Sequence, residues 1–308
     1  MTPNTLGQKK AELATRLRLG VTPAMATPLS NSRSINDVGT AALIDFLIDA
    51  GVSGLFVGGT TGEGILLSLE ERLHLHELSL KAIAGRVPAL LHVGSNTSED
   101  SAVLAEHAES IGADAIVAVT PYFYPIHDES LHSYYYDLAV AAPNTLLFAY
   151  DIPHLAVNSI SPVLFSRLVD SIDSFVGLKT SSPDAQVIRK FIDAAKGKVL
   201  VLAGNERIAL GSLALGAHGL ISGLATAIPE PFINLLRFVK AGKLDLARKE
   251  QERINWLLDV IPSGARIGAI KAILTARGIP AGLAVPPRPM PHPDWQGWSY
   301  MSSALKTD

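Results

Sequence analysis

Short β-rich runs recur along this chain, and a segment with a helical pattern of apolar residues separates each run from the next. This alternation favours parallel strands, because a return to the same edge of a sheet needs a helical crossover. Eight such runs are present, and eight strands are the number that closes a barrel. They cover residues 21–28, 54–58, 89–93, 115–120, 146–152, 175–179, 199–203 and 219–222. We therefore predict the α/β class and a (β/α)8 TIM barrel.

An open, doubly wound sheet is the competing architecture for the same pattern. It usually carries a Gly-x-Gly-x-x-Gly phosphate loop after its first strand, whereas this chain has Ala26-Thr27-Pro28-Leu29 there. Local signals agree with the expected helix boundaries. Ser68 and Glu71 form a capping-box pattern, and glycines that would end helices stand at Gly51, Gly112, Gly197 and Gly216. The barrel is the better interpretation.

The barrel pattern divides the chain into three parts. Residues 1–20 read as a polar lead-in segment and residues 21–230 as the barrel. Residues 231–308 read as a C-terminal helical extension with a Pro-rich tail. Helices are expected there over 231–241, 244–261 and 266–277, and an extended or irregular tail is expected from Pro280 onward.

Composition excludes several classes of partner. The 308 residues are 48% hydrophobic and 18% charged, with a net charge of −3 and no block of like charges, so neither nucleic acid nor an anionic membrane is expected to bind. Cysteine is absent, which excludes disulfides and thiolate chemistry. The start of the chain lacks the apolar region of a signal peptide, and no apolar stretch reaches the ~20 residues of a membrane span. We expect a soluble, cytoplasmic protein.

Lys179 is the first candidate for chemistry, because it ends the apolar run 175–179. Lysine is rarely buried without a partner, so two interpretations are open. The Lys179 side chain either reaches out to solvent or carries a desolvated amine that can attack a carbonyl. Other strand ends favour the second interpretation. Glycine-rich backbone at Gly59 and the hydroxyls of Thr60 and Thr61 can hold a carboxylate, and Tyr150 can carry protons. These groups together indicate a site for a 2-oxo acid.

The same residues carry a family resemblance. Gly59-Thr60-Thr61-Gly62-Glu63, Tyr150-x-Ile152-Pro153 and Gly177-Leu178-Lys179 resemble the dihydrodipicolinate synthase / N-acetylneuraminate lyase family of class I, pyruvate-dependent aldolases, over about residues 21–277. The resemblance implies that Lys179 forms the imine, that Tyr150 and Thr60 transfer protons, and that Thr60 and Thr61 bind the pyruvate carboxylate. Gly59 and Gly223 are further expected substrate-binding positions. It also implies a homotetramer built as a dimer of dimers, and no cofactor.

Two positions depart from the family pattern. Leu155 stands where the synthases place an arginine that binds the carboxylate of aspartate semialdehyde, and an aliphatic side chain cannot do so. Leu155 is therefore expected to contact a different second substrate. Phe123 replaces a tyrosine that completes the family's proton relay across a dimer interface. A neighbouring tyrosine, Tyr122 or Tyr124, or water must then take over that step.

The loop after the seventh strand is the candidate site for the second substrate. Asn205 and Glu206 can bind hydroxyl groups, and Arg207 can bind a terminal carboxylate or phosphate; the alternative is that Glu206 and Arg207 begin the next helix and face solvent. Glu63 is expected to bind the glycine-loop backbone and Asp151 to be structural. The nine histidines do not have metal-ligand spacing, so no metal site is expected.

These observations predict a metal-independent lyase that uses pyruvate together with a small aldehyde or a 2-oxo acid. The leading hypothesis is a Schiff-base aldolase acting on a 2-oxo acid of the deoxy sugar acid type. Three alternatives stay open: a 2-oxo-3-deoxy sugar acid dehydratase of the same family, dihydrodipicolinate synthase proper, and a pyruvate-binding pseudoenzyme.

Overall fold

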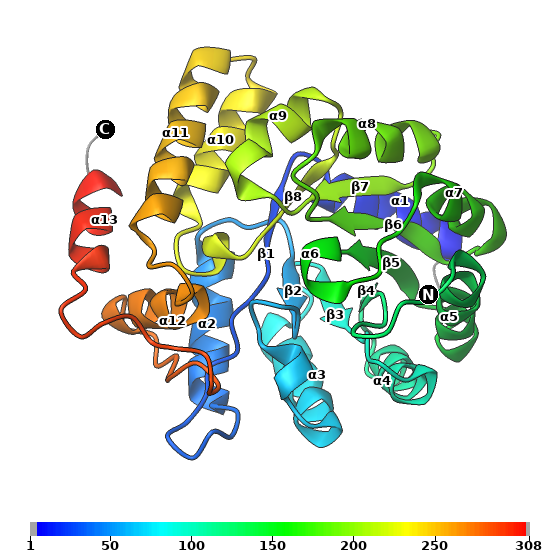
Figure 1. Cartoon of the computed structure of the whole chain (residues 1–308), viewed down its shortest axis with the longest axis horizontal. Coiled ribbons are helices and arrows are strands. Elements are labelled where there is room, and N and C mark those ends of the chain that lie inside the picture. Colours follow the sequence, from blue (N-terminus) through cyan, green and yellow to red (C-terminus); the bar gives the residue numbers. More distant parts are fainter. Residues whose placement is uncertain (1–4, 306–308) are drawn as a thin grey trace.

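The computed structural model describes residues 5–305 and contains a parallel sheet of eight strands in the order β1-β8-β7-β6-β5-β4-β3-β2. A parallel bridge between Ala24 and Phe56 brings the ends of β1 and β2 together and closes the barrel (Figure 1). All eight predicted strands are confirmed, although the first ends at Pro23 and not at Pro28. The strands are β1 (Val21–Pro23), β2 (Leu55–Val57), β3 (Ala89–His92), β4 (Ala115–Val119), β5 (Leu146–Asp151), β6 (Phe175–Thr180), β7 (Leu200–Ala203) and β8 (Gly219–Ser222).

Helices alternate with the strands and surround them (Figure 1). The capping box at Ser68 and Glu71 is present, and the four predicted helix-ending glycines all have positive φ, between 70° and 109°. The helices are α2 (Asp37–Asp49), α3 (Leu69–Ile83), α4 (Ser98–Ser110), α5 (Asp128–Ala141), α6 (Pro153–Ala156), α7 (Pro162–Ser171), α8 (Ala185–Ala194) and α9 (Ala209–Ala214), with 3-10 turns η1 (Gly64–Leu66), η2 (Glu206–Ile208) and η3 (Leu224–Thr226).

The polar lead-in contains a helix that the sequence analysis did not predict, α1 (Leu6–Leu17). Thr5 and Gln8 form a capping box at its start. Leu13 and Leu17 are buried and join the cluster of apolar side chains inside the barrel, together with Phe148 from β5. Burial of these two leucines is the physical reason why this segment is ordered as a helix and is not an extended lead-in.

The C-terminal extension lies to one side of the barrel, beside α2 and α9 (Figure 1). Its three predicted helices are confirmed as α10 (Glu230–Lys240), α11 (Leu244–Val260) and α12 (Arg266–Ala276). The tail is irregular only as far as residue 296, because a further helix, α13 (Gly297–Leu305), follows. The prediction of an irregular tail to the end was therefore wrong. Trp298 packs beside the guanidinium of Arg277, and Met301 is buried.

Within residues 5–305, each helix is too short or too polar to cross a lipid bilayer.

Candidate active site

A cavity of about 300 Å³ opens at the carboxyl ends of the barrel strands. Parallel strands of a (β/α)8 barrel direct their terminal side chains to this end, where the active sites of such barrels lie. The structure brings most of the predicted site residues together in the cavity wall. They are Thr60, Thr61, Tyr150, Leu155, Lys179, Glu206 and Gly223. Gly59 and Arg207 are not among the lining residues.

The amine of Lys179 is held among aromatic rings. Lys179 is paired in register with Tyr150 on β5 and with Leu202 on β7, so its side chain projects on the same side as that of Tyr150. Its Nζ lies 4.0 Å from the centre of the Tyr150 ring and 4.8 Å from that of Phe56. Only 4% of the residue is exposed. The amine is therefore shielded from bulk water but still borders the cavity, as a carbonyl-attacking nucleophile requires.

Two hydroxyl-bearing residues share the cavity wall with Lys179. The Thr60 Oγ1 and the Tyr150 Oη are 3.1 Å apart, and either can donate the hydrogen bond. Thr60 comes from the loop after β2 and Tyr150 from β5, so the barrel closure places them together. Such a pair can transfer a proton between a bound substrate and the loop side of the cavity.

The glycine-rich loop after β2 is closed tightly on itself. A Cβ atom at Gly59 would lie 2.6 Å from the Phe56 ring, and one at Gly64 would lie 1.8 Å from the Gly58 carbonyl oxygen. Gly59 thus allows the close approach that places Thr60 and Thr61 at the cavity wall. On the opposite side Gly223, at the end of β8, leaves room for Thr61, because a Cβ there would lie 2.6 Å from the Thr61 Oγ1.

A buried ion pair ties this loop to the C-terminal extension. The Glu63 Oε2 lies 2.6 Å from the Lys271 Nζ, and both side chains are fully buried. Lys271 on α12 also donates to the Leu283 carbonyl, and the Val285 backbone N–H donates to the Glu63 Oε1. Burial is the main reason why the pKa of Lys271 is lowered. The Glu63 carboxylate thus contacts the C-terminal extension, whereas the sequence analysis expected it to bind the backbone of its own loop.

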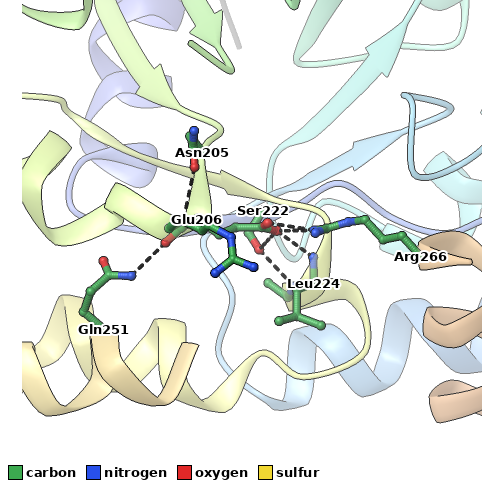
Figure 2. A network of polar contacts seen from close by, with 8 residues as sticks. Asn205, Glu206, Ser222, Leu224, Gln251 and Arg266 are labelled. Carbon is green, nitrogen blue, oxygen red and sulfur yellow. Dashed lines mark hydrogen bonds and ion pairs between the residues drawn. The ribbon is translucent and has the colours of Figure 1, made fainter. Parts of the chain in front are cut away.

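Glu206 is buried at the start of η2 and binds Arg266 of α12 (Figure 2). The Arg266 Nη2 donates to both carboxylate oxygens, at 2.8 and 2.7 Å. Burial alone would raise the pKa of Glu206, but the guanidinium of Arg266 and hydrogen bonds from Leu224 and Ser222 bring the pKa below its ordinary value. Arg266 also lines the cavity, a role that the sequence analysis did not assign to it.

Arg207 lies outside the cavity lining and donates to Asp259 of α11, 2.7 Å away. Its predicted contact with a substrate gains no support from this position. Glu206, by contrast, does not face solvent as the alternative interpretation required. Asp151 lies outside the lining as well, because its carboxylate accepts from Ile160 N and Thr180 Oγ1.

The two departures from the family pattern differ in their relation to the cavity. Leu155 lines the cavity, with 59% of the residue exposed. Phe123 has φ = 81° and is 73% exposed, with its ring packed edge-on against Tyr124. It lines neither this cavity nor the adjoining one of about 160 Å³, where Thr60 and Tyr122 are wall residues. Among the two tyrosines that flank Phe123, Tyr122 is thus the one that shares a cavity with Thr60.

A strand-end lysine beside two hydroxyls in a (β/α)8 barrel defines a lyase of the class I aldolase kind. The chain belongs to the Dihydrodipicolinate synthetase family, whose model matches residues 18–296.

Curated relatives of two kinds resemble the chain. It is 32% identical to the N-acetylneuraminate lyase of Mediterraneibacter gnavus, over 88% of this chain and 86% of the relative. It is 30% identical to the 4-hydroxy-tetrahydrodipicolinate synthase of Methanocaldococcus jannaschii, over 85% of this chain and 90% of the relative.

Solved structures agree with this assignment. A catalytic lysine mutant of the Ruminococcus gnavus sialic acid aldolase has a TM-score of 0.91 and 30% identity, covering 95% of this chain and 98% of the other. A prophage protein of the dihydrodipicolinic acid synthase family from E. coli K12, in complex with pyruvate, has a TM-score of 0.85 and 27% identity, covering 93% and 97%.

Proposed function

We propose that this protein is a Schiff-base-forming, pyruvate-dependent aldolase that reversibly cleaves a 2-oxo acid of the deoxy sugar acid type into pyruvate and an aldehyde. The observation that carries the proposal is the placement of Lys179. Its Nζ borders a cavity, is shielded by the Phe56 and Tyr150 rings, and has the Thr60–Tyr150 hydroxyl pair beside it.

Imine formation follows from this arrangement. Thr60 and Thr61 hold the carboxylate of the 2-oxo acid, and the Lys179 amine adds to its C2 carbonyl carbon. Tyr150 carries a proton to the resulting carbinolamine hydroxyl, which leaves as water, and the lone pair of the nitrogen completes the C=N bond. Lys179 is then bound covalently to the substrate, and no cofactor is needed for this step.

Cleavage uses the imine as an electron acceptor. Tyr150 removes the proton of the C4 hydroxyl, the C3–C4 bond breaks, and its electron pair moves into the enamine while C4 becomes the aldehyde carbon. Protonation of C3 and hydrolysis of the imine release pyruvate and restore the amine. The reverse sequence condenses pyruvate with the aldehyde. Tyr150 exchanges its proton through Thr60, and we assign the next step of the relay to Tyr122 or water in the adjoining cavity.

The relatives include both lyases and synthases, so the preference for the aldolase rests on Leu155. An N-acetylneuraminate lyase and a sialic acid aldolase are among the proteins that resemble this chain. Leu155 cannot supply the guanidinium with which the synthases bind aspartate semialdehyde. We further propose that the enzyme is a cytoplasmic homotetramer, in which exposed Phe123 and Tyr124 contact a neighbouring subunit.

A substrate screen tests the reaction. The purified enzyme is incubated with sialic acid and with 2-oxo-3-deoxy sugar acids, and separately with pyruvate plus aspartate semialdehyde, while free pyruvate is measured with lactate dehydrogenase. Release of pyruvate from a sugar acid is expected. A dehydrated 2-oxo product without pyruvate would assign a dehydratase, and efficient use of aspartate semialdehyde would assign the synthase. Pyruvate binding without turnover of any substrate would indicate a pseudoenzyme.

A further inference from the structure

We propose that Arg266 binds an anionic oxygen group at the far end of the substrate, so that the preferred aldehyde partner carries a carboxylate of its own. The inference rests on the proposed aldolase function and names the substrate class of that same site. It comes from the hydrogen-bonding capacity that the described residues leave free at the end of the cavity formed by η2 and α12.

Both carboxylate oxygens of Glu206 accept hydrogen bonds from protein groups (Figure 2). Its Oε1 accepts from the Ser222 hydroxyl and the Leu224 N–H, both at 2.9 Å, and from the Arg266 Nη2 at 2.8 Å. Its Oε2 accepts from the same Nη2 at 2.7 Å. Glu206 is therefore a positioning residue that fixes the guanidinium, and it has little capacity left to accept from a substrate hydroxyl.

Arg266 keeps donors that the protein does not use. Its Nη2 is directed to Glu206, whereas Nη1 and Nε have no hydrogen-bond partner among residues 5–305. The side chain is 41% exposed, and it forms part of the cavity wall. Gly223 keeps this part of the wall open, since a Cβ there would lie 3.4 Å from the Arg266 Nη2.

Asn205 adds a second donor at the same end of the cavity. Its Oδ1 accepts from the Arg207 backbone N–H at 3.1 Å, which leaves the Nδ2 amide without a partner among the described residues. Asn205 lines the cavity beside Glu206. Among these three side chains, the nitrogens without a partner in the described part of the chain are N–H donors of Arg266 and Asn205, while the oxygens of Glu206 and Asn205 accept from protein groups.

A donor-rich wall selects for its complement. A terminal carboxylate accepts hydrogen bonds without donating any, and its charge is attracted by a guanidinium. An ammonium group is unsuited to this end, because it only donates and would lie beside Arg266. The same wall therefore favours an aldehyde that carries a carboxylate and no ammonium group over aspartate semialdehyde, which carries both.

Pairs of aldehydes in which one member is anionic and the other neutral test the inference. Condensation with pyruvate is measured for succinic semialdehyde against butyraldehyde, and for D-glyceraldehyde 3-phosphate against D-glyceraldehyde. The wild type should prefer succinic semialdehyde to butyraldehyde. Arg266→Lys, which keeps a cation beside Glu206 but removes the Nη1 donors, should lower kcat/KM for succinic semialdehyde by about 10–100-fold, mainly through KM, and change butyraldehyde little.

A second variant guards against misfolding. The double substitution Arg266→Gln/Glu206→Gln removes both charges, so no lone charge is buried, and it should show the same selective loss. Arg207→Gln is the matched control, because Arg207 pairs with Asp259 outside the cavity. It should leave the rates with succinic semialdehyde and with butyraldehyde unchanged.

Borohydride trapping of pyruvate separates the two hypotheses. If the wild type traps pyruvate at Lys179 but Arg266→Lys lowers the rates for charged and uncharged aldehydes equally, the Arg266 inference is wrong and the aldolase stands. If Arg266→Lys lowers kcat/KM only for D-glyceraldehyde 3-phosphate relative to D-glyceraldehyde, the carboxylate assignment is wrong and the group bound is a phosphate. Absence of trapping in the folded wild type would overturn the proposed function itself.

Discussion

The hydroxyl of Thr60 lies 3.1 Å from that of Tyr150, although the two residues are 90 positions apart in the chain. This contact joins the loop that is proposed to hold the pyruvate carboxylate to the strand beside the proposed nucleophile. It allows a proton to pass from one side of the cavity to the other without bulk water. The proposed chemistry can be tested at each of these side chains separately.

Pyruvate and borohydride should label Lys179 covalently. The reason is that its amine borders the cavity beside the hydroxyl pair. Intact mass and peptide mapping measure the label, and Lys179→Ala should abolish both label and turnover while circular dichroism stays unchanged. Lys271 is an internal control, since it is a buried lysine held by Glu63. Label on Lys271, or on any lysine other than Lys179, contradicts the assignment.

Tyr150→Phe should lower kcat by roughly 10²–10⁴-fold, the usual contribution of a general acid or base. The ring stays in place over the Lys179 amine, so imine trapping should persist. Steady-state kinetics and borohydride trapping measure the two effects. Tyr122→Phe is the informative comparison, because Tyr122 shares a cavity wall with Thr60. A normal rate for Tyr150→Phe together with a slow Tyr122→Phe would transfer the proton-carrying role to Tyr122.

Lys271→Met should destabilise the fold by about 3–5 kcal/mol, because it leaves the Glu63 carboxylate buried without its cation. The double variant Glu63→Gln/Lys271→Met should recover most of that loss. Urea denaturation measures both. Arg167→Met is the control, since it breaks an exposed pair with Glu129 and should hardly move the midpoint. Equal losses in the single and double variants would show that the pair itself is not the cause.

The predicted barrel and nucleophile rested on local patterns. Runs such as 175–179 are short, apolar and bounded by turn residues, and the barrel then fixes where Lys179 must point. α1 carried a readable signal, with Thr5 and Gln8 as a capping box and buried Leu13 and Leu17 along one helix, but its polar composition concealed it. α13 follows a proline-rich stretch, and its buried Met301 is packed by tertiary contacts.

The polar pairs around the site could not be predicted in this way. Glu206 and Arg266 are 60 residues apart, and the Glu63–Val285 hydrogen bond spans 222 residues. Nothing in the local sequence distinguishes a glutamate that binds substrate from one that orients an arginine. The same limit explains Arg207, which follows the strand end as a site residue would, yet donates from η2 to Asp259 of α11.

Glu206→Gln should make stability less sensitive to acid. The pKa of Glu206 is lowered from 4.5 in the folded protein, so below about pH 4.5 the unfolded chain binds its proton more readily than the native state does. The stabilising contribution of this carboxylate is thus fully present above that pH and is lost as the pH falls through the lower, folded pKa. Urea midpoints measured from pH 7 to pH 3 should fall less steeply in Glu206→Gln than in the wild type.

Glu129→Gln is the matched control. Arg167 also lowers the pKa of Glu129, but this carboxylate is in full contact with solvent, so the substitution should change the acid dependence less. An acid dependence unchanged by Glu206→Gln would show that the Arg266 contact does not stabilise the charged carboxylate in solution.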